Sequence, residues 1–106
     1  MTIQIAVPAA QIAEFCQRNQ IRKLSFFGSV LRDNFRPDSD VDVLVEFEPS
    51  AHVNYFMLIN MQDELTTLFK REVDLYTPES LKPHFRPKVL QIAEVIYEQA
   101  RQYATA

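Results

Sequence analysis

The fold of this chain is decided by two stretches, LSFFGS at residues 24–29 and DVDVLVEF at residues 40–47. The first stretch is an apolar run that ends at Gly28, the only glycine among the 106 residues. Glycine lets a backbone turn sharply or approach a ligand closely, and Ser29 follows it directly. We therefore expect a strand that ends in a Gly-Ser turn, with free N–H groups of a short helix beyond it that cradle a phosphate.

The second stretch alternates between apolar and other residues, with valine at positions 41, 43 and 45. This period predicts a strand with one face against a core, so Asp40 and Asp42 point the same way. Two neighbouring carboxylates repel each other unless a cation lies between them or solvent screens them. Mg²⁺ takes oxygen ligands and relies on one or two protein carboxylates together with substrate phosphates. The pattern predicts a magnesium site next to the phosphate cradle.

Length and composition predict one globular domain that spans residues 1–106. The formal net charge is −3 and no run of lysine or arginine occurs, which argues against nucleic acid as a direct partner. A single cysteine, Cys16, excludes an intrachain disulfide, and we expect it in the core. We see neither a signal peptide nor a membrane span, so we expect a cytoplasmic protein.

The remaining patterns predict a small α/β domain, a mixed sheet of a few strands with helices packed mainly on one face. The expected strands are residues 21–27, 40–47 and 72–76, and the expected helices are residues 8–19, 54–69 and 87–102, with a short turn at 77–83. The last helix rests on an apolar stripe formed by Val89, Ile92, Ala93, Ile96 and Ala100, which leaves Leu90 and Tyr97 on another side.

Four further side chains have two interpretations each. Asp74 lies in a strand with Val73 and Leu75 toward the core; it is either a solvent-facing aspartate or, if the strands adjoin, a third carboxylate beside Asp40 and Asp42. Arg32 follows Ser29 by one helical turn and either reaches the same phosphates or pairs with a nearby aspartate on the surface. The histidines, His52 and His84, are isolated and fit surface positions better than catalytic ones.

Gly28-Ser29, followed after ten residues by Asp40-Val41-Asp42, resembles the GS…DxD signature of the DNA polymerase β-type nucleotidyltransferases. In so short a chain the pattern is most similar to the minimal nucleotidyltransferases, the MntA-like antitoxins of HEPN/MNT toxin–antitoxin pairs. The resemblance implies the polymerase β-type fold, ATP as substrate, Mg²⁺ and a cognate HEPN toxin as partner. It also implies that Asp40, Asp42 and Asp74 are catalytic and hold the metal, that Asp74 activates the attacking hydroxyl, and that Gly28, Ser29 and Arg32 bind the nucleotide.

Three functions are compatible with these observations. The first is an antitoxin that transfers AMP from ATP to a hydroxyl of the toxin, for which the family precedent is tyrosine. The second is an antitoxin that acts by binding alone, and the third is a nucleotidyltransferase for a small molecule. We favour the first, because Gly28, Ser29, Asp40 and Asp42 all have the chemistry that the reaction needs.

Overall fold

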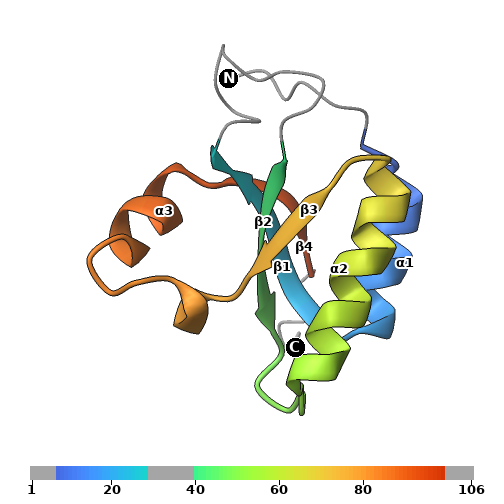
Figure 1. The fold of residues 1–106 in the computed structure, drawn as a ribbon. Coiled ribbons are helices and arrows are strands. Elements are labelled where there is room, and N and C mark those ends of the chain that lie inside the picture. Colours follow the sequence, from blue (N-terminus) through green and yellow to red (C-terminus); the bar gives the residue numbers. More distant parts are fainter. Residues whose placement is uncertain (1–6, 29–39, 100–106) are drawn as a thin grey trace, which may run out of the picture.

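The computed structural model describes residues 7–28 and 40–99, which form a four-stranded sheet and flanking helices (Figure 1). In chain order the elements are α1 (Ala9–Arg18), β1 (Ile21–Phe27), β2 (Val41–Phe47), α2 (Tyr55–Phe69), β3 (Val73–Tyr76), the short 3₁₀ helix η2 (Pro78–Ser80), α3 (Arg86–Ile92) and β4 (Glu94–Glu98). The strand order is β3-β2-β1-β4. Because β2 and β3 run parallel and the other pairs antiparallel, the sheet is mixed, as predicted.

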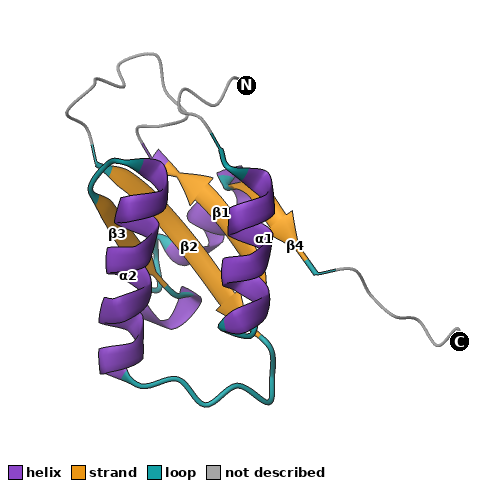
Figure 2. Ribbon diagram, turned by 90° about the vertical axis from the view of Figure 1, so that its right-hand side faces the viewer, coloured by secondary structure: helices purple, strands orange, loops and turns teal. Residues whose placement is uncertain are grey.

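Two helices cover one face of the sheet. Figure 2 shows α1 and α2 side by side on that face, whereas α3 lies on the other side. The helix α1 packs against β1 and β4, and α2 packs against β3. This arrangement confirms the prediction of helices mainly on one face, and it leaves the opposite face of β2 and β3 accessible from the side of α3.

The core lies between the sheet and the helices α1 and α2. Its strand residues are Leu24, Phe26, Val41, Val43, Val45 and Val73, and its helix residues include Ile12, Phe15, Cys16, Met61, Leu65 and Phe69. The rings of Phe26 and Phe69 meet edge to face with centroids 5.2 Å apart. Burial raises the pKa of the Cys16 thiol to about 12, which agrees with its predicted place in the core.

Side chains of α2 and of its N-cap explain why this helix begins where the sequence predicts and how it holds β3. The side chain of Asn54 caps its start, accepting a hydrogen bond from the N–H of Met57 at 2.9 Å. Farther along, the side chains of Thr66 and Gln62 accept hydrogen bonds from the backbone N–H groups of Val73 (3.1 Å) and Leu75 (2.9 Å). These contacts fix β3, an edge strand, against α2 and satisfy backbone groups that would otherwise lack a partner strand.

The prediction of one continuous helix over residues 87–102 is wrong. The helix α3 ends at Ile92, and Glu94–Glu98 forms β4, which pairs antiparallel with β1. The apolar spacing fits a helix, but the segment EVIYE is rich in β-branched and aromatic residues, and the free edge of β1 offers backbone partners. Ile96 and Tyr97 pack against the core from β4, whereas Ile92 stays 46% exposed. Residues 100–102 lie outside the described ranges.

No helix in the described ranges is long and apolar enough to cross a membrane.

Candidate active site

The backbone of Gly28 lies directly against the carboxylate of Asp42. Gly28 follows β1 and has a positive φ of 79°, a conformation that residues with a side chain rarely adopt. A Cβ atom at this position would overlap Oδ2 of Asp42 and lie 3.1 Å from its Cγ. Both the backbone conformation and the close approach therefore require glycine, and the turn at the end of β1 is tied to the acidic residue on β2.

Asp42 and Asp74 are neighbours across the parallel pair of β2 and β3. The register of the two strands places Asp42 opposite Asp74, so the strands adjoin, which is the condition under which Asp74 joins Asp42. Both side chains are on the face away from α1 and α2, because Val41, Val43 and Val73 fill the other face. Desolvation raises the pKa of Asp74, and the nearby negative charge of Asp40 raises it further. Asp42 and Asp74 thus adjoin across the strand pair, and Asp40 is close enough to raise the pKa of Asp74.

Aromatic side chains border these carboxylates. The rings of Phe27 and Tyr76 meet edge to face across the open face of β2, with centroids 5.2 Å apart. Desolvation raises the pKa of the Tyr76 phenol, and the charges of Asp42, Asp74 and Asp40 add to the effect. Tyr76 therefore stays protonated at neutral pH, and its response to all three carboxylates shows how densely negative charge is gathered here.

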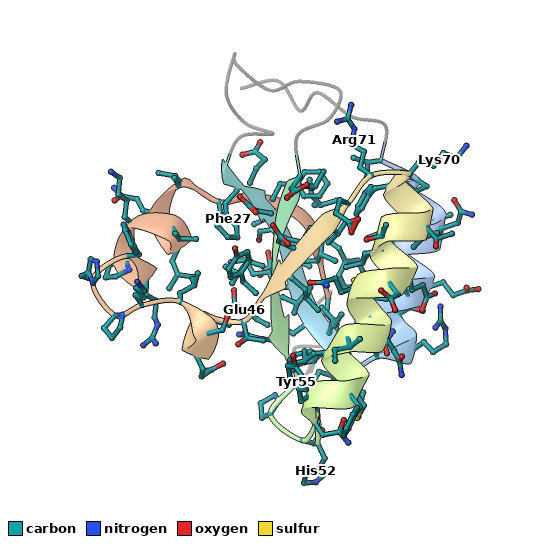
Figure 3. All side chains as sticks on the ribbon, in the orientation of Figure 1. Phe27, Glu46, His52, Tyr55, Lys70 and Arg71 are labelled. Atoms are coloured by element: carbon teal, nitrogen blue, oxygen red, sulfur yellow. The ribbon has the colours of Figure 1, made fainter. Side chains whose placement is uncertain are left out.

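A pocket with a volume of about 590 Å³ opens between this face of the sheet and α3, within the size range of ligand sites. Figure 3 shows Phe27 on the side of the sheet that carries α3. The sheet supplies one wall and the segment from η2 to α3 supplies the other. Its lining residues are Phe27, Gly28, Asp42, Tyr76, Ser80, Leu81, Lys82, Phe85, Lys88, Val89 and Ile92.

Sequence reasoning missed the second wall. Lys82 and Lys88 line the pocket across from Asp42, yet no sequence motif marks them. Their only signal is position, since both follow the strand of Asp74 and stand next to prolines, Pro83 and Pro87, that set the path of the chain. Ser29 and Arg32, predicted to bind phosphate, lie outside the described residues.

The donor set fits Mg²⁺ in chemistry. Asp40, Asp42 and Asp74 offer carboxylate oxygens, the ligands that hard divalent cations prefer. Within residues 7–28 and 40–99, no three acidic, histidine or cysteine side chains come close enough to form a complete metal cage. Magnesium does not need one, because substrate phosphates and waters complete its coordination around one or two protein carboxylates. The acidic face is therefore suited to a metal that arrives with a phosphorylated substrate.

Adjoining carboxylates beside a glycine turn, on a fold of this kind, are suited to an enzyme that transfers phosphoryl groups. Comparison with known proteins agrees with this chemistry. A model of the polymerase beta nucleotidyltransferase family matches residues 10–102. Because this match covers most of the chain, the protein belongs to the polymerase beta nucleotidyltransferase family.

One relative indicates which subgroup of the family this chain resembles. The chain is similar to the protein adenylyltransferase MntA of Thermococcus cleftensis, with 35% identity over 92 residues that cover 87% of this chain and 89% of the relative. This match confirms the resemblance to the MntA-like minimal nucleotidyltransferases that the motif indicates.

Solved structures support the fold. A toxin–antitoxin structure with AMP-PNP superposes with a TM-score of 0.70 at 16% identity, covering 88% of this chain and 75% of that one. A complex of a tri-AMPylated HEPN toxin of Shewanella oneidensis with its MNT antitoxin gives a TM-score of 0.62 at 16% identity, covering 86% of this chain and 70% of that one. At these identities the likeness concerns the fold alone.

Proposed function

We propose that this protein is a Mg²⁺-dependent antitoxin that transfers AMP from ATP to a hydroxyl, that of a tyrosine, on a cognate HEPN toxin and thereby neutralises it. The observation that carries the proposal is the register pair of Asp42 and Asp74 beside a pocket that Gly28 and Asp42 line. The similarity to MntA, named a protein adenylyltransferase, and the toxin–antitoxin complexes of the same fold support this choice of substrate and partner. Both partners would meet in the cytoplasm.

The reaction is a single displacement at phosphorus. The hydroxyl oxygen of the acceptor forms a bond to the α-phosphorus of ATP, the bond from that phosphorus to the oxygen shared with the β-phosphorus breaks, and pyrophosphate leaves. The proton of the hydroxyl passes to a carboxylate, for which we propose Asp74. Its position as the strand neighbour of Asp42 and the upward direction of its pKa, caused by desolvation and by Asp40, support this choice.

Asp40 and Asp42, with Asp74, would hold Mg²⁺. When bound, the metal neutralises phosphate charge and stabilises the negative charge that develops on the leaving group. The carboxylates would hold the metal in place next to the Gly28 turn. Ser29 and Arg32 are proposed to complete the phosphate site from the segment outside the described ranges.

The acceptor has to approach from the open side of the sheet. Phe85 and Ile92 line the pocket and are 51% and 46% exposed, and Leu90 on the same helix is also exposed. These apolar side chains offer a docking surface next to Asp42, and we propose that the toxin binds there. Tyr55, exposed at the start of α2, lies at the other end of the molecule from Phe27 (Figure 3), so Tyr55 and its exposed sequence neighbour Phe56 suit the acceptor less well.

A transfer assay with α-labelled ATP, Mg²⁺ and a HEPN protein, taken from the neighbouring gene if that gene encodes one, tests the proposal. We expect label on the HEPN protein with the wild type, and none with Asp42→Asn or Asp40→Asn, because each change removes a negative ligand while it keeps the size of the side chain. Circular dichroism confirms that the variants are folded. Transfer that persists in both variants contradicts the assignment of the carboxylates.

Two other outcomes separate the alternatives. Neutralisation of the HEPN protein by Asp42→Asn, without label, establishes an antitoxin that acts by binding. Label on a small hydroxyl compound, with no binding to the HEPN protein, establishes a small-molecule nucleotidyltransferase.

A further inference from the structure

The pocket beside Asp42 has walls of opposite charge. The sheet wall carries Asp42, with Asp74 as its strand neighbour, whereas the wall from η2 to α3 carries Lys82 and Lys88. Neither lysine forms an ion pair within the part of the chain that the structure describes. Two cations thus line the same cavity as Asp42, and neither is paired with an anionic side chain of residues 7–28 or 40–99.

The wall that carries the lysines is held in a defined conformation. At its start, the side chains and backbones of Thr77 and Ser80 form reciprocal hydrogen bonds that cap η2. Leu81 is buried, and the guanidinium of Arg86 donates hydrogen bonds to the carbonyls of Pro78 (2.6 Å) and Leu81 (3.2 Å). These contacts fix the backbone on both sides of Lys82 and at the start of α3, which carries Lys88.

A ligand that satisfies both walls must present positive and negative charge together. A nucleoside triphosphate with its magnesium ion does so, since the metal meets carboxylates and the remaining phosphate oxygens meet ammonium groups. A lysine provides a compact point charge that suits a phosphate oxygen. An acidic peptide would satisfy the lysines but would be repelled by Asp42 and Asp74.

We infer that Lys82 and Lys88 bind the phosphate chain of the nucleotide across from the carboxylates, so that the segment from η2 to α3 forms one side of the nucleotide site. This inference rests on the proposed transfer reaction, and it adds residues that no sequence motif identifies. By drawing negative charge off the β- and γ-phosphates, the lysines would also favour departure of pyrophosphate.

Titration calorimetry with AMP-PNP and Mg²⁺ tests the inference on the wild type, on Lys82→Gln, on Lys88→Gln and on the double variant. Exposed charge pairs contribute little each, so we expect about a threefold loss of affinity for each single variant and about tenfold for the double variant. Lys70→Gln is the matched control, because Lys70 is exposed at the end of α2, away from α3 (Figure 3), and should bind as the wild type.

The number of phosphates on the ligand makes the test specific. The loss in the double variant should shrink from AMP-PNP to ADP to AMP and vanish for adenosine, and it should diminish at high ionic strength. Thermal melts establish that the variants keep their fold.

Two results for the double variant would overturn the inference. The first is an affinity for AMP-PNP equal to that of the wild type, and the second is an equal loss of affinity for adenosine, which would mean a change in pocket shape. If nucleotide affinity is unchanged but the KM for the HEPN protein rises, the lysines contact the acceptor, and the proposed function stands without this inference. A wild type that binds no nucleotide with Mg²⁺ contradicts the proposed function as well.

Discussion

At the scale of single residues, Gly28 is constrained twice. Its positive φ and its contact with Asp42 both exclude a side chain. The usual interpretation of a glycine in such a turn is close approach to a phosphate, but here the side chain of a neighbouring strand already fills the space. The glycine therefore positions a carboxylate in addition to any role toward the nucleotide.

Gly28→Ala should impair transfer far more than folding. The positive φ costs a residue with a side chain about 1 kcal/mol, whereas the new Cβ must displace the Asp42 carboxylate. A displacement of about 1 Å near reacting groups lowers rates by about 100-fold, which we expect here. Chemical denaturation and the transfer assay measure the two effects. A variant with near-normal activity would show that the Asp42 side chain relocates without consequence.

Asp74→Asn should raise the melting temperature of the metal-free protein at pH 7. The folded-state pKa of Asp74 is raised by desolvation and by Asp40, so its stabilising contribution is present at low pH and is lost as the pH rises through that pKa. At neutral pH the ionised group therefore destabilises the fold, and asparagine removes the charge. Thermal melts in EDTA at pH 7 and below pH 4 test this.

The same melts with Mg²⁺ provide the control. Added Mg²⁺ should stabilise the wild type more than Asp74→Asn, because a ligand stabilises the state to which it binds. An unchanged or lower melting temperature for the variant in EDTA would mean that the carboxylate is well solvated or paired.

At the scale of elements, the pattern of the sequence predicts the N-terminal part of the chain well and its C-terminal part poorly. The strand β1 and the helix α2 appear with the predicted bounds, because each has a clear period and a residue that ends or caps it, Gly28 or Asn54. The strand β4 was missed, because apolar residues at positions 89, 92, 93 and 96 satisfy a helical period equally well. Only the free edge of β1, a tertiary feature, favours a strand there.

The candidate site, too, has one part that the sequence predicts and one part that it does not. The strand period predicts which face of its strand Asp74 occupies, but the sequence leaves open whether that strand adjoins the strand of Asp42. The parallel pairing of β2 with β3 in the fold answers that question. The place of Lys82, Lys88 and Phe85 depends on how the segment after β3 returns over the sheet, and contacts such as those of Arg86 decide that path. The spacing of apolar residues along a single sequence does not encode such contacts.

Two alanine substitutions distinguish the strand from the predicted helix. Ile96 packs against the core from β4, so Ile96→Ala should lower the free energy of unfolding by about 1–2 kcal/mol. Ile92 is nearly half exposed at the end of α3, so Ile92→Ala should change it by no more than about 0.5 kcal/mol. Urea denaturation measures both. Equal, large losses of unfolding free energy would instead support the predicted continuous helix, in which both residues belong to one buried stripe.

At the scale of the whole molecule, the two faces of the sheet have different roles, and this difference connects fold and function. The helices α1 and α2 use one face for the core, and the other face presents carboxylates, aromatic rings and a pocket. Because α3 covers that face only from the side, a protein acceptor can reach Asp42 past the exposed residues Phe85 and Ile92. The chain thus has the form of an enzyme whose acceptor is supplied by another molecule.

Intact-mass spectrometry tests the proposed AMP transfer directly, on a cognate HEPN protein co-expressed with the wild type or with Asp42→Asn. We predict that the HEPN protein gains mass in AMP-sized steps with the wild type, that peptide mapping places the gain on a tyrosine, and that the gain disappears with Asp42→Asn. A HEPN protein that is neutralised by the wild type yet shows no gain in mass would contradict the claim that this protein acts as an AMP transferase.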